Sequence, residues 1–128
     1  MVNVGDVLWL FAGTIRDPKM KMHACVYVDD GIFFRINSKS HFPGSILITQ
    51  EEHPFLKWDS YLECGGPIEF DVSEIEESFE REWGVAGQLS DKALQEMGSH
   101  IETVRQLTRA EKQKFKDSIR RECERRGI

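Results

Sequence analysis

The first half of the chain alternates short apolar runs with polar turns, which is the pattern of β-strands. Strands are predicted at residues 7–11, 23–28, 32–36, 45–49 and 68–70. Between the second and third runs, Asp29-Asp30-Gly31 favours a tight turn, because glycine accepts the positive φ that such a turn needs. These two strands are therefore expected to form an antiparallel hairpin. Gly65-Gly66-Pro67 is expected to interrupt the chain before the last strand.

The second half of the chain changes to a helical period. Apolar residues recur every three or four positions from Val72 to Trp83 and again from Ala93 to Val104, which predicts two helices. A third helix is predicted in the basic tail, where the apolar stripe is thin, so this helix is expected to lie on a surface of this chain or of another. The expected N-terminal caps are Ser73 with Glu76, Ser90, and Thr108 with Glu111.

Strands followed by helices predict an α+β fold: a small, partly open antiparallel β-barrel with helices packed at one end. The length of 128 residues is typical of one domain. We expect the barrel to occupy residues of about 4–71 and the helical part residues of about 72–126.

Composition narrows the class of protein further. The net charge of −5 argues against a generally basic surface that coats nucleic acid. Acids predominate in residues 73–104, whereas the tail from residue 105 is basic, so the tail either binds phosphate or packs on acidic residues of this chain or of a partner. No apolar run is long enough to span a membrane, the N-terminus lacks the features of a secretion signal, and three widely spaced cysteines indicate reduced thiols in the cytoplasm.

Candidate chemistry gathers in two polar loops that flank the predicted hairpin. The chain has no motif for a phosphate-binding loop, a zinc protease or an α/β-hydrolase, and we expect no metal and no cofactor. The loops contain Arg16, Lys19, Lys21 and His23 on one side and Asn37, Ser38, Lys39, Ser40 and His41 on the other. If the loops converge, they supply the cations, hydroxyls and imidazoles that metal-free RNA cleavage requires. The alternative is that they are ordinary solvated residues.

The stretch 53–64 is dense in reactive and aromatic side chains. His53 and Cys64 offer an imidazole and a thiol, the components of a thiol hydrolase, although a buried structural cysteine is the simpler interpretation. Trp58 and Tyr61 are able to stack on bases or on a peptide, or else to fill the core or a dimer interface.

The order of these features resembles the PemK/MazF family of toxins. Gly5-Asp6-Val7-Leu8-Trp9 is similar to the opening strand of that family, Asn37-Ser38 follows a strand as in the family, and Gly87-Gln88-Leu89-Ser90 is similar to its helix entry. The resemblance extends from about Val4 to Val104. It implies an SH3-like barrel that forms a homodimer, cleaves single-stranded RNA without metal and is silenced by an antitoxin protein.

The resemblance also implies particular site residues. Ser38 occupies the family position that follows the third strand, whereas Lys21-Met22-His23 stands where the family has Arg-Pro. Lys21 is therefore the expected phosphate-stabilising cation, His23 the expected acid or base, and Ser38 the third catalytic residue. The expected substrate-binding residues are Arg16, Lys19, Asn37, His41 and His53. Because lysine lacks the bidentate fork of arginine, two alternatives stay open: an inactive member that binds RNA or a peptide as a dimeric barrel, and, more weakly, a Cys64–His53 thiol hydrolase.

Overall fold

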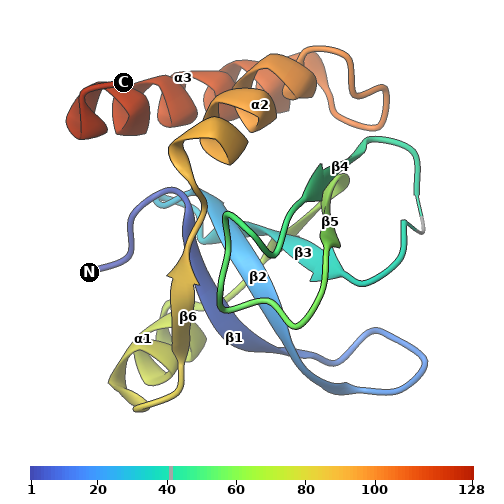
Figure 1. Cartoon of the computed structure of the whole chain (residues 1–128), viewed down its shortest axis with the longest axis vertical. Helices are drawn as coiled ribbons and strands as arrows, with labels where there is room; N and C mark the ends of the chain where they lie inside the picture. Colours follow the sequence, from blue (N-terminus) through green and yellow to red (C-terminus); the bar gives the residue numbers. More distant parts are fainter. Residues whose placement is uncertain (41) are drawn as a thin grey trace.

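The computed structural model describes residues 1–40 and 42–128. These residues form a six-stranded antiparallel sheet, curled into a half-barrel, and three helices (Figure 1), which confirms the predicted α+β class. In chain order the elements are β1 (Asp6–Ala12), β2 (Lys19–Tyr27), β3 (Ile32–Asn37), β4 (Ser45–Ile48), β5 (Ser60–Glu69), α1 (Val72–Glu80), β6 (Val85–Gln88), α2 (Asp91–Ile101) and α3 (Arg109–Arg126). The strands lie in the order β4-β5-β3-β2-β1-β6.

The hairpin of β2 and β3 forms as predicted. Gly31 has a φ of 64°, which a residue with a Cβ rarely adopts, and its amide donates a hydrogen bond to the Val28 carbonyl at 3.0 Å. Beyond this turn the strands pair antiparallel, with His23 opposite Arg35. The hairpin therefore sets which polar residues of the two strands face each other.

Each face of the curled sheet carries its own apolar core. On one face, α2 and α3 pack against Val7, Ala24 and Phe34, and the ring of Phe115 from α3 meets Phe34 edge to face at 5.7 Å. On the other face, Leu8 and Leu10 of β1 pack with residues that include Ile75 of α1. Figure 1 shows the two larger helices together on one side of the sheet and α1 on the opposite side. The side chains of β2 and β3 consequently alternate between two different environments.

Three strands differ from the sequence prediction. β2 begins at Lys19, so the basic residues Lys19 and Lys21 belong to a strand and not to a loop. β5 runs through Gly65-Gly66-Pro67 without a break, because Pro67 lies at an irregular point of the β3–β5 register, where the ladder does not depend on its missing amide proton. β6 lies between the first two predicted helices, where no strand was predicted. Its four residues are too few to produce a pattern, and pairing with β1 defines it.

The helix caps agree with the predictions at two of three helices. The Ser90 hydroxyl accepts a hydrogen bond from the Ala93 amide at 3.0 Å, and Thr108 with Glu111 forms the predicted capping box. At α1 the box is two residues earlier than predicted, since the Asp71 amide donates to the Glu74 carboxylate at 3.1 Å. In the described ranges, no helix is long and apolar enough to span a bilayer.

The basic tail packs on its own chain, one of the two arrangements considered from the sequence. Arg126 donates to the Leu89 carbonyl at 2.8 Å, to the Asp91 carboxylate at 3.1 Å and to the Glu122 carboxylate at 3.0 Å. Lys116 pairs with Glu102 at 2.5 Å. These contacts tie α3 to α2 and make it part of the domain.

Candidate functional site

Four polar side chains meet on the α1 face of the sheet, beyond the apolar residues that α1 covers. They are Lys21 and His23 of β2 with Arg35 and Asn37 of β3, here called the Lys21 cluster. The Lys21 ammonium donates a hydrogen bond to the Asn37 carboxamide oxygen, and the Arg35 Nε donates to the His23 Nε2 at 3.1 Å. The cluster thus links the two strands of the hairpin through side chains as well as backbone.

His23 is the buried base of this cluster. Its side chain is fully inaccessible to solvent, and its Nδ1 lies 2.9 Å from the Lys21 carbonyl oxygen. Because Nε2 accepts the Arg35 bond, Nδ1 must carry the proton and donate it to that carbonyl. Burial, together with the charge of Arg35, lowers the pKa of His23 to about 3. A neutral imidazole with both nitrogens engaged orients Arg35 and is poorly placed to transfer a proton to a substrate.

Because the folded protein keeps His23 neutral, we expect mild acid to lower the free energy of unfolding. The pKa is 6.5 in the unfolded chain and about 3 in the folded protein, so this contribution to stability is complete above pH 6.5 and is lost as the pH falls toward 3. We expect the free energy of unfolding to fall by about 2 kcal/mol between pH 7 and pH 5. Urea unfolding at both pH values measures it. The variant His23→Gln should be less stable at pH 7 but should lose this part of the pH dependence; an unchanged dependence in the variant would show that His23 is not its source.

Arg35 is the site residue that the sequence reasoning missed. It is half-buried, and no described residue accepts a hydrogen bond from its two terminal NH2 groups. A guanidinium can bind two oxygens of one phosphate, and here β3 supplies this group, not the start of β2. The sequence could have indicated Arg35, because a hairpin that turns at residues 29–31 places Arg35 opposite His23.

The cluster also changes the chemistry of Lys21. Burial has the largest effect and the positive charge of Arg35 the next, and both lower the pKa of the Lys21 ammonium below its usual value. The nearby carboxylate of Glu63 acts in the opposite direction and raises this pKa. Lys21 therefore loses its proton more readily than an exposed lysine, which is a property of lysines that serve as bases.

The other predicted loop residues lie around the cluster without joining it. Ser38 follows Asn37 directly, but it is exposed and lines an open hollow of about 680 Å³ with Lys39, Gln50, Trp58 and Asp59. Arg16 is exposed in the loop between β1 and β2, and Lys19 lies 4.0 Å from the Asp17 carboxylate with both side chains in solvent. His41 lies outside the described residues.

His53 and Cys64 have different partners and do not form a pair. The ring of His53 is buried, with Nδ1 at 2.8 Å from the Thr49 carbonyl and Nε2 accepting a hydrogen bond from the Ser90 amide at 3.0 Å. Burial raises the pKa of the Cys64 thiol to about 12, which keeps it protonated near neutral pH. His53 thus fastens a loop to the start of α2, and Cys64 belongs to the core.

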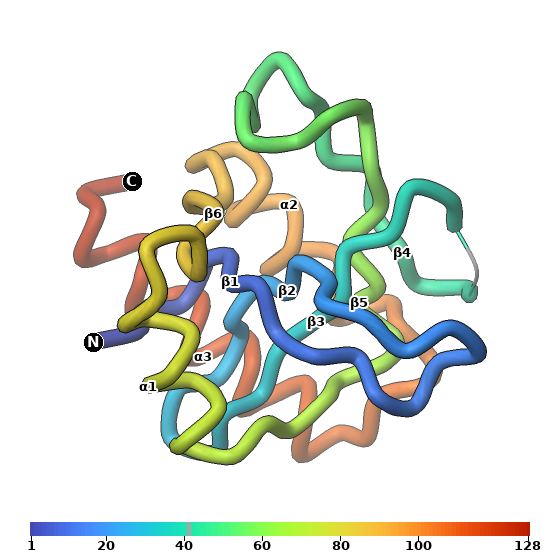
Figure 2. Tube along the Cα trace, turned by 90° about the horizontal axis from the view of Figure 1, so that it is seen from below, coloured from blue at the N-terminus to red at the C-terminus, as the bar shows by residue number. Residues whose placement is uncertain are grey.

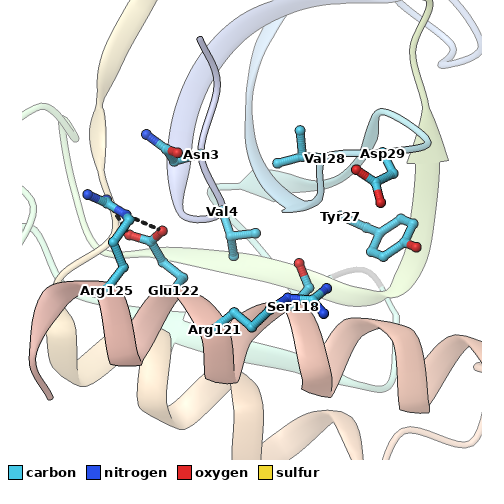
Figure 3. Close-up of a pocket in the computed structure, with 9 residues that line it drawn as sticks. All are labelled: Asn3, Val4, Tyr27, Val28, Asp29, Ser118, Arg121, Glu122 and Arg125. Carbon is cyan, nitrogen blue, oxygen red and sulfur yellow. Dashed lines mark hydrogen bonds and ion pairs between the residues drawn. The ribbon is translucent and has the colours of Figure 1, made fainter.

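A second hollow, of about 230 Å³, lies between α3, the end of β2 and the N-terminal segment (Figure 3). Its buried carboxylate, Glu122, accepts from Arg125 at 2.6 Å and from Arg126 at 3.0 Å. These charge-assisted bonds lower the pKa of Glu122, although its burial acts in the opposite direction as the largest single effect. The Glu122 carboxylate of this hollow is thus already paired with two arginines of its own helix.

Neither metal ligands nor relatives identify the site. In residues 1–40 and 42–128, no group of three or more His, Cys, Asp or Glu side chains is arranged to hold a metal ion. Comparison with protein-family models and with curated proteins finds no match for this chain. The Lys21 cluster is the candidate site because it combines two half-buried cations and an amide on one face of the sheet.

Proposed function

We propose that this protein is an endoribonuclease that binds single-stranded RNA across the Lys21 cluster and cleaves it without a metal ion, in the manner of PemK/MazF toxins. The observation that carries the proposal is that a guanidinium fork, whose terminal NH2 groups no described residue accepts, lies on the same face of the sheet as a lysine of lowered pKa. The order of strands and motifs along the chain supports the same assignment. A negatively charged phosphate placed between Arg35 and Lys21 would be bound by both.

In the proposed reaction, the 2′-hydroxyl oxygen forms a bond to phosphorus while the bond from phosphorus to the 5′ oxygen breaks. Lys21 in its neutral form accepts the proton of the 2′-hydroxyl and then returns a proton to the leaving 5′ oxygen. Arg35 stabilises the additional negative charge on the phosphorane oxygens. Asn37 positions the Lys21 amine, and His23 positions the Arg35 guanidinium. The products are a 2′,3′-cyclic phosphate and a 5′-hydroxyl.

A second candidate function is RNA binding without cleavage. Two observations favour it. His23, which the resemblance assigns as acid or base, is buried and fully bonded, and Ser38 lines a hollow that no residue of the Lys21 cluster lines. In this case Lys21 and Arg35 bind the phosphate backbone, and no product forms.

Cleavage by the purified protein separates the two candidates. Incubation of labelled single-stranded RNA with a chelator should give fragments that end in 2′,3′-cyclic phosphate, and Lys21→Ala should lower the rate by about 100-fold or more. Lys112→Ala, which removes a half-buried lysine of α3, is the matched control and should leave the rate unchanged. Binding of RNA with no fragments would establish the second candidate and refute the nuclease.

We propose from the same resemblance that the protein acts in the cytoplasm as a homodimer and that an antitoxin protein covers the RNA-binding face. Light scattering of the purified chain tests the dimer. A monomer at micromolar concentration that still cleaves RNA would show that the dimer is not required.

A further inference from the structure

Trp58 is an exposed aromatic residue on a loop that is held in place. Its exposed fraction is 56%, although several hydrogen bonds hold the loop that carries it, residues 49–59. In Figure 2 this green loop stands out from the body of the protein. Trp83 has a similar exposure of 53%, but the Arg81 guanidinium covers its ring at 5.2 Å. No described residue gives the ring of Trp58 such a partner.

Three anchors fix the loop. His53 accepts the Ser90 amide bond, and Leu56 is inserted into the core with 2% of its surface exposed. The ring of Phe55 lies against Gly87 of β6, where a Cβ would come within 2.4 Å of it. Nothing in this arrangement requires an apolar ring at position 58, yet the anchors fix the course of the backbone that carries it.

The base of the loop is closed in the same way. The Gln50 amide donates to the Asp59 carboxylate at 2.9 Å, and the Gln50 carboxamide donates to the carbonyls of Leu56 and Lys57 at 3.0 and 3.1 Å. The Ser60 hydroxyl donates to the carbonyl of Trp58 itself at 3.0 Å. A rigid backbone of this kind lowers the entropy that a ligand must remove when it stacks on the indole.

Trp58 lines the open hollow of about 680 Å³ together with Ser38, Lys39, Gln50 and Asp59. Ser38 is the next residue after Asn37 of the Lys21 cluster, so the hollow adjoins the end of the strand that carries Arg35 and Asn37. An aromatic face, a cation and hydrogen-bonding side chains are the components with which proteins bind an unpaired base. We infer that a nucleobase of single-stranded RNA stacks on Trp58 in this hollow while its phosphate backbone lies on Lys21 and Arg35. This inference rests on the RNA-binding face proposed above.

The experiment measures binding of single-stranded 2′-fluoro RNA, which lacks the attacking hydroxyl and is not consumed, by fluorescence anisotropy. Trp58→Ala should weaken binding about tenfold or more, and Trp58→Phe should retain most of the affinity. Trp83→Ala is the matched control, since this tryptophan is equally exposed but lies after α1. An abasic strand of the same charge should bind wild type and Trp58→Ala equally, because it has no base to stack.

The outcomes separate the two proposals. If wild type binds RNA, Lys21→Ala weakens binding, and Trp58→Ala behaves like Trp83→Ala, then the base site is refuted and the phosphate site stands. If Trp58→Ala weakens the abasic strand as much as the RNA, stacking is refuted as the cause. If wild type binds no RNA, the proposed function and the base site are both overturned.

Discussion

Replacement of Arg35 by alanine is expected to lower the rate of RNA cleavage by about 100- to 1,000-fold, which is the loss typical of removing one charge-stabilising group from a transition state. The side chain is held by its Nε bond to the buried His23, so the fork is already oriented before RNA binds. Arg35→Lys should recover only a small part of the rate, because an ammonium cannot bind two phosphate oxygens with the same geometry. Single-turnover cleavage of a labelled RNA measures both variants.

Arg35→Ala should also move the pH profile of the remaining activity. The positive charge of Arg35 lowers the pKa of Lys21, so its removal raises that pKa and shifts the rising part of the profile to higher pH. Arg109→Ala, which removes an exposed arginine at the start of α3, is the control for general loss of positive charge. Full activity in Arg35→Ala, or a profile shifted to lower pH, would contradict the assignment.

The sequence predicted the fold class because the local signals agree with the tertiary structure. The turn at residues 29–31 and the caps at Ser90 and Thr108 depend on residues within a few positions of one another, so they are readable without the fold. β6 was missed for the opposite reason. Its residues Val85–Gln88 carry no alternation of their own, and they are a strand because β1 offers them backbone partners.

The site was harder to predict than the fold, because the decisive facts are contacts across strands. Lys21 was selected for its position in the chain, but its lowered pKa depends on burial and on Arg35, which no local pattern contains. His23 and His53 were selected as imidazoles free to act, whereas the structure uses the nitrogens of both to fix a neighbouring side chain or backbone. Sequence gives the type of group, and the fold decides whether it is exposed to a substrate.

The loop that carries Trp58 depends on elements that meet at β6. The loop of residues 49–59 is anchored to the segment that follows β6 by His53 and to β6 itself by Phe55. β6 in turn is joined to α1 by a tight connection at Gly84. The Gly84 carbonyl accepts from the Trp9 amide at 2.8 Å. The single proton of the Ser78 hydroxyl lies between the Gly84 carbonyl at 3.1 Å and the Trp9 carbonyl at 3.0 Å. These hydrogen bonds thus join α1, β1 and the start of β6 around Ser78.

Gly84→Ala is expected to be the most destabilising single-methyl change in this region. A Cβ at Gly84 would lie 1.6 Å from the Ser78 carbonyl oxygen, and this atom belongs to the backbone of α1, so it cannot move aside as a flexible side chain does. The connection must open, which breaks the bonds around Ser78 and separates β6 from β1. We expect a loss of about 3 kcal/mol or more in the free energy of unfolding, measured by urea denaturation.

The matched control for this change is Gly66→Ala. A Cβ at Gly66 meets no atom within 4 Å, so the same substitution should be neutral or slightly stabilising, because it restricts the unfolded chain. Since opening at Gly84 also loosens the anchors of the 49–59 loop, Gly84→Ala should weaken RNA binding at a temperature where most of the protein is still folded, and Gly66→Ala should not. Equal unfolding free energies for the two variants would show that the close approach of Gly84 to Ser78 does not hold α1 and β6 together.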